Sequence, residues 1–210
     1  MVSYHTTASP LRKGNKEKRD EPEMTTEART TRYMGDLTAL DIVTIAMFAA
    51  VGRALWFPTN FLRFLAPFDL LYTTGVAGLN LAIVVTIIRK PGAATLTQIA
   101  HSLLGALIFG TSFWVWPVNV GRGIIADLIF WKTFYVTDPG RKAMLYLVIG
   151  TFIACTYDLS VWLGFIQKYA FGVVYPMWMY PTVIIGASLS AAILSMFGNR
   201  IGETLRALTI

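Results

Sequence analysis

Arg122, Asp127 and Asp158 are ionisable residues within long apolar stretches of the sequence. Burying a charge away from water is costly, so such residues usually pair with one another or mark a functional site. If two carboxylates face one guanidinium, one of them remains able to accept hydrogen bonds from a bound molecule. Structural ion pairing is the alternative; we favour a ligand site, to which Asn119, one turn before Arg122, also contributes.

Three further ionisable residues within or beside the apolar stretches are weaker candidates for a functional role. Arg53 and Asp69 lie at facing ends of the first two apolar stretches, which favours a structural ion pair between them. His101 stands in the middle of the third stretch and is expected to be a hydrogen-bonded core histidine rather than a ligand or proton relay.

Six apolar stretches carry these groups. Each is close to the ~20 residues that a helix needs to cross a ~30 Å hydrocarbon core. With 55% hydrophobic and 14% charged residues, the composition is atypical of a soluble domain. The sequence therefore predicts an all-α, polytopic membrane protein, a six-transmembrane-helix bundle. The predicted spans are Leu37–Phe57, Phe68–Ile88, Ala93–Trp114, Val118–Val136, Ala143–Ile166 and Met177–Phe197.

The positions of Lys and Arg predict the orientation of this bundle. Of the 18 such residues, 13 lie in the two tails and the second and fourth connections, whereas only Arg63 and Lys168 lie in the alternate connections. Cations near span ends stay cytoplasmic. We therefore expect a multi-pass protein of the cell membrane with both termini cytoplasmic and with Arg122 and Asp158 in the outer half. The net charge of +6 is then explained by topology rather than by nucleic-acid binding.

Composition divides the chain into three parts. Residues 1–36 are polar without apolar periodicity and are expected to form a disordered cytoplasmic tail. Residues 37–197 are the membrane domain. Residues 198–210 are expected to form a short cytoplasmic amphipathic helix on the inner surface.

Aromatic residues gather near the predicted outer ends of the spans. An interfacial aromatic belt explains some of them. The scarcity of aromatics at the inner ends indicates, in addition, a site for a flat, nitrogen-containing ring held by stacking and cation–π attraction. The first and fifth connections, residues 58–67 and 167–176, are expected to fold over its mouth. The aromatic residues assigned to binding are Trp56, Trp116, Trp162 and Trp178.

Ala46, Ala50 and Ala54 form a stripe of small side chains on the first span. A spacing of four places them on one helix face, where another helix backbone can approach closely. From the sequence, packing within the chain's own bundle and contact with a partner protein are equally compatible with this stripe.

Several chemistries have no motif here. The sequence contains no phosphate-binding G-x-x-x-x-G-K-[ST] loop, metal-ligand cluster or nucleophile elbow, and its one cysteine, Cys155, lies within the fifth span. We therefore expect no cofactor and no metal. If the protein moves a solute at the expense of ATP, the ATPase is a separate subunit.

Two short motifs resemble a known family. The turn Arg89-Lys90-Pro91-Gly92-Ala93-Ala94 and the segment from Arg122 to Phe130, R-G-I-I-A-D-L-I-F, are similar to motifs of the YkoE-type group. That group belongs to the S components, the substrate-binding subunits of energy-coupling factor (ECF) vitamin transporters. The resemblance covers most of residues 37–197; Asp127 stands where the group usually has Glu, and Arg122 where it usually has Gln.

The resemblance implies capture of thiamine or its hydroxymethylpyrimidine precursor from outside the cell. It also implies partners, namely a transmembrane coupling subunit, which would contact the alanine stripe, and two cytoplasmic ATPases. The chain itself would then not be an enzyme. The alternatives are a small integral-membrane enzyme or assembly factor that uses Asp127, Asp158 and His101 for acid–base chemistry, or a proton-coupled carrier.

Overall fold

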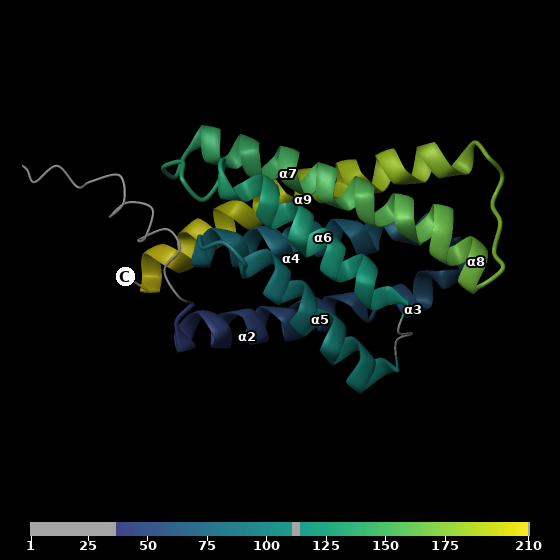
Figure 1. The fold of residues 1–210 in the computed structure, drawn as a ribbon, viewed down its shortest axis with the longest axis horizontal. Coiled ribbons are helices and arrows are strands. Elements are labelled where there is room, and N and C mark those ends of the chain that lie inside the picture. The colour runs from purple at the N-terminus through teal and green to yellow at the C-terminus, as the bar shows by residue number, and fades with distance from the viewer. Residues whose placement is uncertain (1–36, 111–113, 210) are drawn as a thin grey trace, which may run out of the picture.

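The computed structural model describes residues 37–110 and 114–209, and these are helical apart from short connections (Figure 1). Four short elements lie in the connections: α3 (Thr59–Leu62), η1 (Arg63–Leu65), η2 (Trp162–Gln167) and α8 (Lys168–Ala170). The six long helices are α2 (Ala39–Trp56), α4 (Asp69–Ile88), α5 (Ala93–Phe109), α6 (Val115–Trp131), α7 (Arg141–Val161) and α9 (Met179–Thr209).

Four of these helical stretches are long and apolar enough to cross a membrane: Ala39–Trp56, Asp69–Ile88, Arg141–Ala170 and Met179–Leu208. The all-α class and the membrane-compatible character predicted from the sequence are thus found in the described residues. Helices α5 and α6 are shorter, with 17 residues each. At 1.5 Å per residue each rises about 25 Å.

Backbone geometry sets several helix boundaries. Helix α2 begins at a reciprocal capping box in which the Thr38 side chain accepts from the Asp41 N–H and the Asp41 carboxylate accepts from the Thr38 N–H. Arg89 and Gly92 adopt positive φ angles of 49° and 90° and form the tight turn between α4 and α5. Gly110, with a φ of 59°, ends α5, so this helix is shorter than the predicted span to Trp114.

Helix α4 lies at the centre of the bundle and packs most extensively on α9. Small residues permit this close approach: a Cβ on Gly78 would lie 2.6 Å from the Ala191 carbonyl oxygen. The same contact continues at Gly198, where a Cβ would lie 2.5 Å from the Leu79 carbonyl oxygen. Residues 198–209 are helical as predicted, but they continue α9 instead of forming a separate helix, and Gly198 and Gly202 pack on α4.

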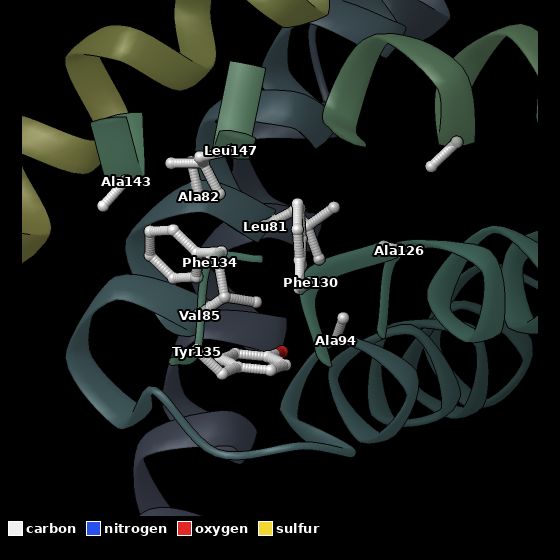
Figure 2. Close-up of a cluster of buried hydrophobic side chains, with 11 residues drawn as sticks. Leu81, Ala82, Val85, Ala94, Ala126, Phe130, Phe134, Tyr135, Ala143 and Leu147 are labelled. Atoms are coloured by element: carbon white, nitrogen blue, oxygen red, sulfur yellow. The ribbon is translucent and has the colours of Figure 1, made fainter. Parts of the chain in front are cut away.

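A buried apolar cluster holds α4, α6 and α7 together (Figure 2). Its centre contains Leu81, Phe130, Phe134 and Leu147, each at most 1% exposed. The Phe130 ring lies against Gly150 of α7, where a Cβ would be 2.3 Å from the ring. The start of α2 and the end of α9 lie at the same end of the molecule, with the α4–α5 and α6–α7 turns (Figure 1). The predicted tail, residues 1–36, lies outside the described residues.

Candidate functional site

A cavity of about 700 Å³ lies at the opposite end of the bundle, where α2 ends and α6 begins. Its wall comes from α2, α4, α6, α7 and the segments that follow α2 and α7. The polar and aromatic residues that line it include Arg53, Asp69, Asn119, Arg122, Asp158, Gln167, Trp56, Phe57, Trp162 and Phe171.

Arg122 and Asp158 form an ion pair in this wall, with Arg122 Nη1 2.8 Å from Asp158 Oδ2. Arg122 Nη2 donates to Gln98 Oε1 of α5 at 2.5 Å. Both charged residues are buried, and each comes from a different helix. The pair therefore joins α6 to α7 and presents a charge-balanced surface to the cavity.

Asp127 does not line the cavity. Its carboxylate accepts hydrogen bonds from the backbone N–H of Ala94 and of Thr95, from the Thr95 hydroxyl and from the Tyr135 hydroxyl, at 2.6–3.3 Å. The prediction that Asp127 and Asp158 both face Arg122 is therefore wrong. The sequence spacing allows either partner, but the N-terminus of α5 supplies unsatisfied N–H groups that Asp127 caps.

Asp127 is one part of a polar ladder between α5 and α6. Thr95 bonds Asp127, Gln98 bonds Arg122, and Ser102 accepts from Asn119 Nδ2 at 3.2 Å. Gly123 lets the two helices meet closely, because a Cβ there would lie 2.7 Å from the Thr95 Cα. Asn119 and Arg122, two members of this ladder, also line the cavity.

A second cluster surrounds Arg53 at the end of α2. The Arg53 guanidinium carbon lies 4.9 Å from the centre of the Trp56 ring, a cation–π distance. His101 Nε2 lies 3.5 Å from Arg53 Nη1, and the His101 ring meets Trp56 edge to face at 5.9 Å. His101 is buried and does not line the cavity, in keeping with the predicted core role. Arg53 and Asp69, expected to be a structural ion pair, both line the cavity.

The four tryptophans assigned to binding divide into two groups. Trp56 and Trp162 line the cavity. Trp116 is half-buried on α6 and Trp178 is 62% exposed, and neither is a lining residue. Trp178 follows segment 172–176, which has no regular secondary structure, and its exposure is compatible with an interfacial aromatic.

Both long connections, which were predicted to fold over the mouth of the site, contribute residues to the cavity lining. Thr59 and Ala66 come from the first, and Gln167, Phe171 and Val173 from the second. Helix α7 changes to π-helical geometry at Trp162, which turns the segment up to Gln167 along the cavity. Such π-helical turns are often found at functional sites.

Ala46, Ala50 and Ala54 are exposed on α2, whereas Ala49 beside them is fully buried. The alanine stripe therefore does not pack inside the described bundle. Because large apolar residues on the same helix, such as Val43 and Met47, are also exposed, this face of α2 suits lipid or another protein.

The sequence did not predict three polar residues of this region. Thr73 and Thr74 line the cavity, and Gln98 lies beside it, bonded to Arg122. A signal for Gln98 exists: Thr95, Gln98 and Ser102 recur at helical spacing within an apolar segment. Among the described residues, no group of three or more His, Cys, Asp or Glu could hold a metal ion.

Comparison of the chain with protein-family models, with curated proteins and with solved structures found no match in any of the three.

Proposed function

We propose that the chain is the membrane-embedded substrate-capture subunit of an ECF-type importer for a vitamin or vitamin precursor. In this proposal all six long helices cross the cell membrane, both termini are cytoplasmic, and the cavity opens to the outside. The cavity carries the proposal: about 700 Å³ of space lined by aromatic rings and by charges of both signs, at the end of the bundle opposite most of the Lys and Arg in the described residues.

The lining also bears on the ligand. Arg53 and Arg122 supply two positive charges and Asp69 and Asp158 two negative ones, so the wall is balanced. With Asp127 bound elsewhere, the described lining residues include no excess carboxylate that would attract a cation. Of the two ligands that the family resemblance implies, the neutral hydroxymethylpyrimidine suits this wall better than the cationic thiamine. Trp56 and Trp162 offer flat surfaces for its ring.

The partners in this proposal are a transmembrane coupling subunit and two cytoplasmic ATPases. The exposed alanine stripe of α2 is the surface on which the coupling subunit would approach. Hydrolysis of ATP belongs to the ATPases, so this chain is not itself an enzyme. The rival enzyme requires Asp127, Asp158 and His101 to act together, but each has a different set of partners.

The test has two arms on protein purified from its native membrane. Titration calorimetry with hydroxymethylpyrimidine, thiamine and an unrelated vitamin such as biotin should show saturable binding of a pyrimidine compound. Mass spectrometry of the copurified proteins should find ATPase subunits. Absence of both binding and ATPases would contradict the proposal, and binding without ATPases would favour a carrier of another class.

A further inference from the structure

A second cavity, of about 580 Å³, lies at the end of the bundle remote from the proposed substrate site. The end of helix α4, the connection between α6 and α7, and the last turns of α9 line this open cavity. Its size is within the ~300–1,000 Å³ typical of small-molecule sites. Four charged residues line it, Arg89 and Arg206 with Asp138 and Glu203.

The two positive and two negative charges balance, and the two residues of each sign come from different segments. Arg89 follows α4 and Asp138 lies in the α6–α7 connection, whereas Glu203 and Arg206 are one turn apart on α9. A cavity with both signs suits a ligand that carries both. A purely anionic ligand would meet Asp138 and Glu203 as well as the arginines, at an electrostatic cost.

The cationic wall is held in place. Arg89 donates through Nη2 to the carbonyl oxygens of Phe134 and Thr137, and its guanidinium stacks 4.7 Å from the centre of the Phe134 ring. The backbone of Arg89 has a φ of 49°, an uncommon conformation for a residue other than glycine. These contacts fix a positive charge on the wall at a constant position, so little ordering is needed when a ligand binds.

The cavity also has an apolar border that faces outward. Val136 lines it and is 47% exposed, and Leu208, one residue beyond the lining Ala207, is 80% exposed. Helix α9 is a candidate membrane span as far as Leu208, and α4 ends at Ile88. If Asp69–Ile88 of α4 spans the hydrocarbon, as its length and composition allow, the cavity lies at the end of that span, where the polar headgroups of a bilayer meet the hydrocarbon.

From this combination we propose that the second cavity binds the headgroup of a zwitterionic phospholipid, a phosphodiester that bears a primary ammonium, as in phosphatidylethanolamine. Arg206 donates to the phosphate, beside the fixed charge of Arg89. Asp138 and Glu203 accept from the ammonium. The acyl chains leave past Val136 and Leu208 into the bilayer. The headgroup thereby joins the end of α9 to the α6–α7 connection.

Native mass spectrometry of the detergent-purified protein tests this with three added lipids: phosphatidylethanolamine, phosphatidylcholine and phosphatidylglycerol. The parent protein should retain one phosphatidylethanolamine at concentrations where the other two are lost. Arg206→Gln should weaken that binding by about tenfold, because a charge-assisted hydrogen bond is removed. Arg206→Lys should retain most of it. Arg200→Gln is the matched control, since Arg200 is exposed on the same helix and does not line the cavity.

Three results would overturn the proposal. Equal retention of phosphatidylglycerol would show that the carboxylates do not select an ammonium. Equal loss on Arg200→Gln would show general attraction to the basic surface. Competition by water-soluble glycerophosphoethanolamine at the same concentration as the lipid would show that the ligand is a soluble phosphate ester. Arg206→Gln alters one partly exposed side chain near the helix end, and an unchanged melting temperature will confirm that its fold is intact.

Discussion

Asp158 of α7 lies 2.8 Å from Arg122 of α6, and Gln98 of α5 holds the other end of the same guanidinium. Three helices therefore meet at one buried arginine in the wall of the proposed substrate cavity. Removing one member of a buried pair leaves the other charge without compensation. The pair is thus both a structural junction and part of the candidate binding surface.

We expect Asp158→Asn to destabilise the protein by about 3–5 kcal/mol, because the buried Arg122 loses its countercharge. Arg122→Gln combined with Asp158→Asn should recover part of this loss, since no uncompensated charge remains. Thermal or denaturant unfolding in detergent measures both variants. Single and double variants with additive losses would show that the two residues contribute independently.

We expect Asp127→Asn to lower stability while leaving ligand affinity within about threefold. The neutral side chain weakens the hydrogen bonds that the carboxylate accepts from Ala94, Thr95 and Tyr135. A hydrogen bond to a charged group contributes about 1.5–3 kcal/mol to stability. Melting temperature and calorimetric affinity are to be measured on the same preparation. Loss of ligand binding at an unchanged melting temperature would show that Asp127 belongs to the binding site.

We expect Trp162→Ala to reduce affinity for the pyrimidine ligand by about tenfold, because a ring surface of the cavity is removed. Trp178→Ala is the matched control, as Trp178 is 62% exposed and lies outside the lining. Calorimetry on both variants gives the comparison. Equal losses would place the ligand elsewhere or show that the segment around Trp178 closes over it.

We expect Ala50→Trp to leave ligand binding intact and to reduce both uptake and recovery of the ATPases. The added ring projects from an exposed face of α2 and would hold a partner helix away. Ala49→Trp is its counterpart, because Ala49 is fully buried and the same ring there must disrupt the bundle. Uptake that persists in Ala50→Trp would mean that the partner docks on another surface.

We expect an impermeant thiol reagent added to intact cells to label Val174→Cys and not Thr204→Cys, both made in a Cys155→Ser background. Val174 is exposed near the substrate cavity, and Thr204 is exposed near the other end of α9. The reverse pattern would invert the orientation that the Lys and Arg distribution predicts.

The lengths of the apolar stretches and the distribution of charge were sufficient to predict six long helices and most of their bounds. Both properties belong to consecutive residues and do not depend on contacts between distant segments. The choice between Asp127 and Asp158 as the partner of Arg122 could not be made that way. It depends on how α5 meets α6, and that contact is set by Gly123 and by the N–H groups at the start of α5. The sequence predicts a helix over 198–210 but not that it continues α9, where Gly198 packs closely on α4 in a contact between distant segments.

The polar ladder between α5 and α6 restricts how the molecule can open. A slide of one helix along the other by a single turn would separate Thr95 from Asp127, Gln98 from Arg122 and Ser102 from Asn119 at the same time. Breaking several buried polar contacts together is costly where no water replaces them. We therefore expect the two helices to move together as one rigid body. Under the proposed function we expect a solute to enter past the segments that follow α2 and α7, because these segments line the cavity outside the polar ladder.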